Sequence, residues 1–267
     1  MLNEEAVVVP ATIRRERMLQ MITEREFMRV TELSEEFRIS DVTVRADLDS
    51  LDHAQSVRRV RGGAMARSQA ARPEPSFEES LTASAVEKQR IGERAAVMVT
   101  SGMSVVLDVG TTTTAIARAL AARTDLEQVS VITNGLNIAL ELEAAMPGVT
   151  VLVTGGTLRR LQHSLVDPMA SLLLERMHAD LAFVGCNGVD VPHGVTNVNL
   201  PEAEVKRRMI ASAERTVVVA AGPKIGQAHL IRVADLADVQ LVITGASAAA
   251  GRVAELRRAG TDVIQVE

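Results

Sequence analysis

The sequence predicts two domains of different fold class: an N-terminal winged helix-turn-helix, and a C-terminal α/β domain with a mostly parallel sheet. Three observations predict this division. Short helical segments and a basic hairpin come first, a stretch rich in proline and small polar residues follows, and apolar strand segments then alternate with helices. The expected bounds are 11–66 for the first domain, 67–80 for a linker and 81–267 for the second domain. A chain of 267 residues is long enough for both.

The N-terminal domain is expected to hold three helices. The first runs from about residue 11 to 26, with apolar residues near helical spacing. Thr31 is expected to cap the second helix, TELSEEF, and Ser40 the third, DVTVRADLDSLDH. The second and third helices are separated by a three-residue turn, and this arrangement is a helix-turn-helix.

The third helix should present an outward face. Val44, Leu48 and Leu51 share one side at helical spacing, so Val42 and Arg45 point away from the core. The segments 56–60 and 61–64 then predict a short β-hairpin, the wing that follows many such helices.

Charge is concentrated near this hairpin. Between residues 55 and 72 there are five arginines and no acidic residue, although the whole chain has a net charge of −5. A local cationic strip on an acidic protein indicates contact with a polyanion, and the alternative is a solvated surface run. Lysine is rare, because the whole chain holds only Lys88, Lys206 and Lys224.

Composition excludes several classes of function. The chain has no Trp or Tyr and four Phe, which disfavours single-strand nucleic-acid binding through aromatic stacking. The one cysteine, Cys186, excludes an intrachain disulfide and a multi-cysteine metal site. No apolar run approaches the ~18 residues of a membrane helix, and the start lacks a signal-peptide pattern, so a cytoplasmic protein without membrane contact is expected. No P-loop, GxGxxG or HExxH motif occurs, and neither a cofactor nor a metal is expected.

The C-terminal part alternates between strands and helices, which predicts a mostly parallel sheet covered on both faces. The expected strands are 104–107, 129–132, 149–153, 181–184, 216–219, 239–243 and 263–264. The expected helices are 87–99, 113–122, 136–146, 168–178, 202–213 and 247–258.

Small polar residues follow four of these strands, in the loops 108–114, 133–135, 154–157 and 185–188. Carboxyl ends of parallel strands meet at one edge of a sheet, where ligands bind. Backbone N–H and hydroxyl groups at a helix N-terminus can hold an anion there. The alternative is that these glycine, threonine and asparagine residues are ordinary turn and cap residues.

These residues, in this order, resemble the DeoR family of bacterial transcription regulators over nearly the whole chain. The N-terminal matches are RERM, VTELSEEFRISDVTVRADLDSL and VRRVRGGA. The C-terminal matches are Lys88 with Ile91, DVGTTTT, ITNGLNIA, TGGTLRR, ADLAFVGCNGVD, GVTN, Glu204 with Lys206, and Lys224 with Gly226.

The resemblance implies a winged helix that binds double-stranded operator DNA, and an effector domain similar to ribose-5-phosphate isomerase that senses a phosphorylated sugar. It also implies a non-enzymatic repressor that the metabolite releases from DNA, working as a homo-oligomer (dimer or tetramer). Three departures stand out: Ala46 where a second Arg is usual in the recognition helix, Asp167 where Gly is usual, and Pro223 in a segment that usually carries Asp and Ser ahead of Lys224.

The candidate residues fall into two groups. The expected DNA contacts are Ser40, Val42, Thr43, Arg45, Arg58, Arg59 and Arg61. Of these, Val42, Thr43 and Arg45 should meet base edges, and the three wing arginines should meet phosphates. The expected effector contacts are Asp108, Gly110, Thr111, Thr112, Thr113, Thr133, Asn134, Gly156 and Lys224. The phosphate should sit on the residues 110–113, with Lys224 adding charge.

A second interpretation is a sugar-phosphate isomerase with an accessory N-terminal domain. An isomerase needs a general base positioned at the substrate carbons, and Asp108 and Lys224 have suitable chemistry. The Asp that usually precedes Lys224 is absent. Turnover of ribose 5-phosphate would discriminate between the two interpretations.

Overall fold

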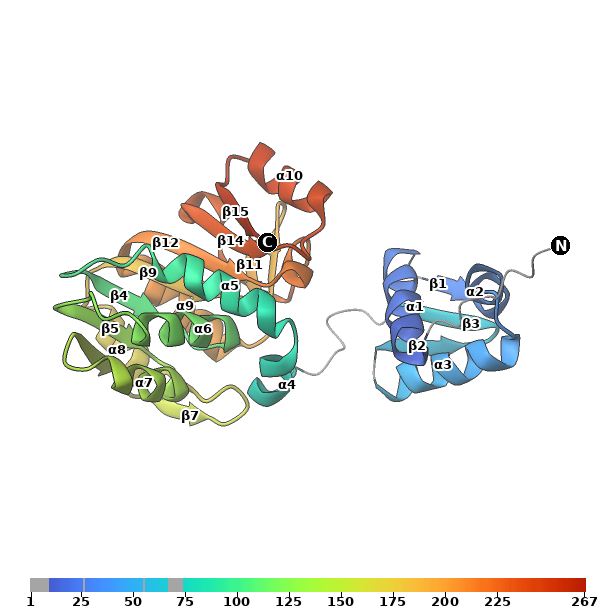
Figure 1. The fold of residues 1–267 in the computed structure, drawn as a ribbon, viewed down its shortest axis with the longest axis horizontal. Coiled ribbons are helices and arrows are strands. Elements are labelled where there is room, and N and C mark those ends of the chain that lie inside the picture. Colours follow the sequence, from blue (N-terminus) through green and yellow to red (C-terminus); the bar gives the residue numbers. More distant parts are fainter. Residues whose placement is uncertain (1–9, 26, 55, 67–73) are drawn as a thin grey trace. The chain divides into compact units, whose positions relative to one another are not determined.

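A computed structural model describes residues 10–25, 27–54, 56–66 and 74–267. The chain divides into two compact units, Met1–Pro73 and Glu74–Glu267 (Figure 1). Across the described residues, no helix combines the length and the apolar character needed to cross a membrane.

The first unit is a helix-turn-helix with a wing, as the sequence predicts. Its elements are α1 (Ala11–Arg25), β1 (Phe27–Arg29), α2 (Val30–Phe37), α3 (Asp41–His53), β2 (Val57–Val60) and β3 (Gly63–Ala66). The strands form an antiparallel sheet in the order β1-β3-β2. Each helix contributes a fully buried side chain to one core, including Met18 from α1, Leu33 from α2 and Leu48 from α3.

The expected N-cap at Thr31 is wrong, because Thr31 lies inside α2 and the N-cap is Arg29. The backbone N–H of Arg29 donates to Glu32 Oε2 at 2.7 Å. The N–H of Val30, the first residue of α2, donates to the carbonyl of Gly62 at 2.9 Å. Pairing of β1 with β3 therefore sets the start of α2, and that tertiary contact leaves no local signature in the sequence.

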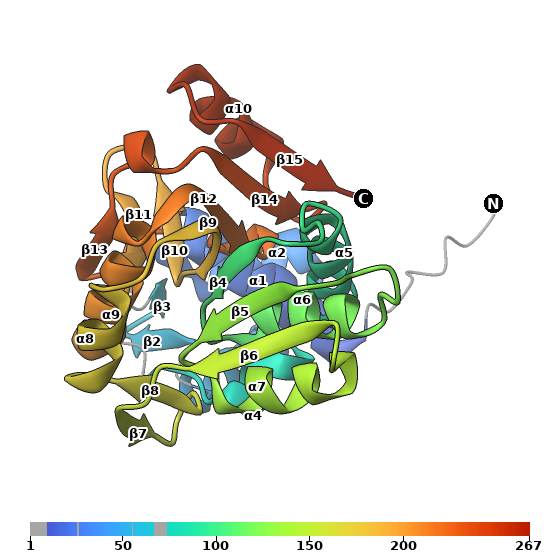
Figure 2. The same ribbon diagram turned by 90° about the vertical axis from the view of Figure 1, so that its left-hand side faces the viewer.

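The second unit is built on a seven-stranded parallel sheet that contains all seven expected strands. Its strands are β4 (Ser104–Leu107), β5 (Val129–Thr133), β6 (Val149–Val153), β9 (Ala179–Gly185), β12 (Ala213–Ala220), β14 (Leu241–Gly245) and β15 (Val263–Val266). They lie side by side in the order β15-β14-β12-β9-β4-β5-β6, and every pair is parallel (Figure 2).

Helices cover both faces of this sheet. On one face lie α5 (Ala85–Ala96), α6 (Thr111–Ala121) and α7 (Leu136–Leu142); on the other lie α8 (Met169–Leu174), α9 (Leu200–Ala211) and α10 (Ala250–Arg258). Successive side chains of a strand enter opposite layers: Val217 and Val219 pack with the first set, and Val218 packs with the second. The predicted α/β class is confirmed.

Several short elements were not predicted. They are the hairpin β7 (Thr157–Arg159) and β8 (Ser164–Val166), a small sheet of β10 (Gly188–Asp190), β11 (Gly194–Asn197) and β13 (Ile231–Ala234), the short helix η3 (Gly222–Lys224), and α4 (Phe77–Thr82). The expected linker 67–80 needs correction, because Ser76 caps α4 and residues 74–80 belong to the second unit. Residues 67–73 lie outside the described residues.

Candidate functional sites: a helix-and-wing face and a lysine-lined cavity

The N-terminal end of α3 is built as the sequence predicts. Ser40 caps the helix: its hydroxyl accepts the N–H of Thr43 at 3.2 Å and lies 2.9 Å from the Thr43 hydroxyl. Val42 is 72% exposed and Arg45 is also exposed. Val42 and Arg45 therefore lie on the outward face of α3 that the helical spacing predicts.

Three acidic residues of α3 pair with arginines of the first unit. Asp47 is buried and accepts from Arg14 at 2.7 Å. Arg45 lies 3.6 Å from Asp41, and Arg59 lies 3.0 Å from Asp49. Within the described part of the chain, the other two wing arginines, Arg58 and Arg61, form no ion pair with a carboxylate. The three predicted wing contacts are therefore not equivalent.

The second site is a cavity of about 260 Å³ at the carboxyl ends of β4, β9 and β12. The chain leaves β4 toward β5 and β6 on one side and returns to β9 on the other, so β4 and β9 flank the switch point of the sheet, where ligands bind in open α/β folds. The polar wall residues are Glu74, Ser80, Ser84, Lys88, Thr111, Thr112, Thr113, Gln162, Asn187, Asn197, Glu202, Lys206 and Lys224.

All three lysines of the chain line this cavity. Lys88 Nζ donates to the carbonyl of Ser80 at 2.5 Å, and Lys224 Nζ donates to the carbonyl of Cys186 at 2.5 Å. Burial, and next the charge of Lys224, lowers the pKa of Lys88 to about 8, against a smaller opposing effect of Glu87. Burial also lowers the pKa of Lys224. The ammonium groups of Lys88, which is buried, and Lys224, which is half-buried, both donate to carbonyls, and they favour an added anion.

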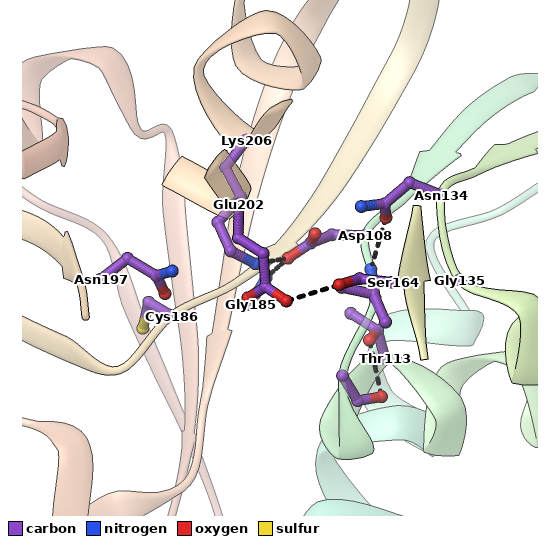
Figure 3. Close-up of polar contacts among 12 residues, drawn as sticks. Asp108, Thr113, Asn134, Gly135, Ser164, Gly185, Cys186, Asn197, Glu202 and Lys206 are labelled. Atoms are coloured by element: carbon purple, nitrogen blue, oxygen red, sulfur yellow. Dashed lines mark hydrogen bonds and ion pairs between the residues drawn. The ribbon is translucent and has the colours of Figure 1, made fainter. Parts of the chain in front are cut away.

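Lys206 is engaged differently, because it forms a buried ion pair with Asp108. The same Asp108 oxygen accepts the N–H of Gly185 at 2.9 Å (Figure 3). Burial lowers the pKa of Lys206, but the carboxylates of Asp108 and Glu202 outweigh it and the pKa is raised. Asp108 is fully buried and is not part of the cavity wall. The isomerase interpretation needs Asp108 as a general base, but a ligand in the cavity would not reach its buried carboxylate.

The start of α6 also lines the cavity, through residues 110–113. Gly110 is the N-cap with φ 142°, and the Thr113 hydroxyl donates to its carbonyl at 2.9 Å. First-turn N–H groups have no acceptor within the helix and lie at the positive end of its dipole. Gly110, Thr111, Thr112, Thr113 and Lys224 are thus the predicted effector residues that the structure brings together.

Thr133, Asn134 and Gly156 do not line the cavity, because β5 and β6 lie outside the switch point. Asn134 Oδ1 accepts the N–H of Val109 at 3.0 Å, and the Thr133 hydroxyl accepts the N–H of Gly135 at 3.0 Å. Gly156 has φ 125°, and a Cβ there would lie 2.1 Å from the carbonyl oxygen of Val166. All three have structural roles in this fold.

The remaining polar wall carries groups that sequence reasoning missed. Glu202 on α9 accepts from the Ser164 hydroxyl at 2.6 Å (Figure 3). It also accepts from Arg159 Nη1 at 2.8 Å. The amides of Gln162, Asn187 and Asn197 also line the cavity. The scarcity of lysine and the i, i+4 spacing of Glu202 and Lys206 are the signals that could have found the lysines and Glu202.

The three departures from the resembled pattern occupy different places. Ala46 is exposed on α3. Asp167 accepts the hydroxyl of Ser171 at the start of α8, away from the cavity. Pro223 lies on the cavity wall beside Lys224.

Comparison with known proteins covers both units. Residues 10–70 match the family described as DeoR-like helix-turn-helix domain, and residues 83–246 match the DeoR C terminal sensor domain. Similar proteins include the putative aga operon transcriptional repressor of Escherichia coli O157:H7, 34% identical over 98% of this chain and 96% of that protein. The regulator GlpR of Haloferax volcanii is 32% identical over 94% and 96% of the two chains.

Among solved structures, ribose 5-phosphate isomerase A of Methanocaldococcus jannaschii has a TM-score of 0.38 and 17% identity, over 53% of this chain and 55% of that chain. The sorbitol operon regulator SorC of Klebsiella pneumoniae has a TM-score of 0.42 and 10% identity, over 93% and 99%. Likenesses at this level say nothing about activity.

Proposed function

The chain belongs to the DeoR family of helix-turn-helix transcription regulators, and from that premise we propose that it releases operator DNA when a phosphorylated sugar enters the lysine-lined cavity. One observation carries the proposal. The three lysines of the whole chain, on three different elements, meet at one cavity that also faces the N-terminus of α6.

The phosphate is assigned to the end of the cavity formed by residues 110–113, Lys88 and Lys224. First-turn amides at a helix N-terminus bind phosphate groups, and the two ammonium groups add positive charge in the same cavity. A sugar phosphate carries about −1.5 to −2 charges at neutral pH, as other phosphate monoesters do. A free sugar brings no such charge and should bind far more weakly.

The sugar is assigned to the remaining polar residues of the cavity wall. Carboxylate and amide groups of Glu202, Asn187, Asn197 and Gln162 offer acceptors and donors that suit several hydroxyl groups. A cavity of about 260 Å³ holds one small ligand. We therefore assign the effector to the class of phosphorylated monosaccharides and related polyols.

The DNA contacts are assigned to α3 and the wing. Val42, Thr43 and Arg45 face outward at the start of the helix and would meet base edges, while Ser40 positions them as the cap. Among the wing arginines, Arg58 and Arg61 would meet phosphates. Arg59 donates to the carbonyl of Gly63 at 3.2 Å and pairs with Asp49. We therefore assign Arg59 a smaller contribution to phosphate binding than Arg58 and Arg61.

We also propose that the protein is a homo-oligomer, a dimer or tetramer, assembled through residues 81–267. A single winged helix buries roughly 600–1,000 Å² of its surface on DNA, which is little for tight discrimination. Linked copies would bind repeated half-sites together.

The experiment is a thermal-shift screen of pentose and hexose phosphates, inorganic phosphate and the free sugars, followed by operator-release titrations. Ligand at 100 times its Kd should stabilise the protein by about 2.7 kcal/mol. Thr112→Glu and Lys224→Ala should bind operator and fail to release it. Arg232→Ala, which removes an exposed arginine of β13, is the matched control and should behave as wild type. If no phosphorylated sugar shifts the melting temperature, or if both cavity variants respond like wild type, the assignment is wrong.

A further inference from the structure

Residues 74–84, which we call the strap, connect the cavity to the segment that leads to the DNA-binding unit. They are the first residues of the second unit, directly after residues 67–73. Five of them line the cavity: Glu74, Pro75, Ser80, Ala83 and Ser84. A ligand in the cavity would therefore touch the piece of chain that is continuous with the DNA-binding unit.

The strap is attached at its start to the β7–β8 hairpin. Arg159 donates through both terminal nitrogens to the Glu74 carboxylate, at 3.1 Å for Nη1. Gln162 Nε2 donates to the carbonyl of Pro75 at 2.6 Å. A two-pronged arginine–carboxylate contact fixes geometry as well as charge, so Glu74 anchors this end together with Phe77, whose N–H donates to the carbonyl of Leu161 at 2.8 Å.

Arg159 is shared between two carboxylates. Its Nη1 also donates to Glu202 Oε1 at 2.8 Å, and Glu202 belongs to α9 rather than to the strap. Burial, and also the charge of Glu202, raises the pKa of Glu74, against the lowering effect of Arg159. Two carboxylates that compete for one guanidinium leave the Glu74 anchor sensitive to added negative charge.

The other end of the strap is attached through Lys88, which is also a proposed contact of the ligand. Lys88 Nζ donates to the carbonyl of Ser80, which belongs to the strap. Lys88 also lies on the proposed phosphate end, near Lys224. A phosphate is a much stronger acceptor for an ammonium group than a peptide carbonyl, so the ligand would draw Lys88 away from Ser80.

We propose that the strap is the element through which the cavity controls DNA binding. The attached strap favours the arrangement that binds operator, and an anionic ligand detaches it by taking Lys88 from Ser80 and by adding negative charge to the cavity that Glu74 lines. This inference rests on the proposed function. A ligand that competes with the strap contacts binds the detached strap more tightly than the attached one. By linkage, this difference in affinity sets how far the ligand can weaken operator binding.

The two carboxylates on Arg159 give opposed predictions. Glu74→Gln weakens the anchor, so operator affinity without ligand should fall toward that of ligand-saturated wild type, and added ligand should change it less than about twofold, against ~5–150-fold for wild type. Glu202→Gln removes the competing charge, so Arg159 binds Glu74 more firmly. Operator affinity without ligand should therefore rise above that of wild type, and the ligand, which loses a sugar contact, should release operator less. A merely structural role for this cluster would make both variants fail alike.

The probe is the sugar phosphate that gives wild type its largest melting shift. Arg159→Lys, which keeps the charge and loses the two-pronged geometry, should resemble Glu74→Gln and replaces it if Glu74→Gln does not fold. Amide hydrogen exchange of residues 74–84 in wild type should accelerate when the probe is added.

Two failures are distinguishable. If no sugar phosphate shifts the melting temperature of wild type or releases its operator, both the proposed function and the role of the strap are wrong. A wild type that responds, together with a Glu74→Gln variant that binds and releases operator as wild type does, overturns the strap alone.

Discussion

Lys88 is the residue whose titration bears most directly on ligand binding. Its pKa of about 8 places its charge change just above neutral pH, and the lowering comes first from burial and next from Lys224. The protonated fraction of such a group falls about tenfold between pH 7 and pH 9, while the phosphate is already largely dianionic above its second pKa near ~6. Sugar-phosphate affinity should therefore fall as pH rises, by roughly tenfold over this range. Calorimetric titration at pH 7, 8 and 9 measures it.

The control for this prediction is Lys88→Arg, because a guanidinium stays protonated over the whole range. Its affinity for the sugar phosphate should be nearly flat between pH 7 and 9, whatever its absolute value. A Lys88→Arg protein with the same slope as wild type would mean that another group titrates.

Asp108 gives a second prediction at the residue scale, since the sequence predicts a ligand contact and the structure shows a buried ion pair. Asp108→Ala leaves the ammonium of Lys206 buried without its main carboxylate, so the free energy of unfolding should fall by about 3–5 kcal/mol. Adding Lys206→Met should restore part of the loss. Denaturant unfolding measures both. If Asp108→Ala kept its stability and lost only ligand affinity, the result would contradict the structural role and support the original prediction that Asp108 contacts the ligand.

At the scale of elements, α3 and the wing should divide the work of DNA binding. Arg58→Ala and Arg61→Ala should each flatten the slope of log K against log salt by about 0.9. With one phosphate contact fewer, DNA binding by each variant releases fewer counterions. Arg59→Ala should flatten it less, since Asp49 already holds that guanidinium. Arg45→Ala should instead cost about 1–3 kcal/mol at one base pair.

Operator titrations from low to physiological salt, with single base-pair variants, separate these effects. Equal and salt-independent losses for all four variants would contradict the division between helix and wing. A loss of slope for Arg59→Ala as large as for Arg58→Ala would show that the Arg59–Asp49 pair opens on DNA.

The same scale shows what the sequence could and could not predict. Apolar, β-branched runs predicted all seven strands of the main sheet, because burial on both faces leaves a strong local pattern. Residues 110–113 and 133–134 have the same chemistry after neighbouring strands, yet only the first group reaches the cavity. The difference lies in strand order, which places β9 beside β4, and local sequence does not encode that order. Glu74 and Glu202 were missed because their partner, Arg159, is distant along the chain.

At the scale of the whole molecule, tight operator binding should depend on assembly. A second winged helix in the same oligomer binds its half-site as an intramolecular event, which can raise affinity by ~10²–10⁴ without any new contact. DNA with two half-sites should therefore bind more tightly than DNA with one by a factor in that range. Light scattering at micromolar concentration should give a dimer or tetramer, for the full chain and for residues 74–267 alone. A monomer that still binds operator tightly, or equal affinity for one and two half-sites, would contradict the proposed assembly.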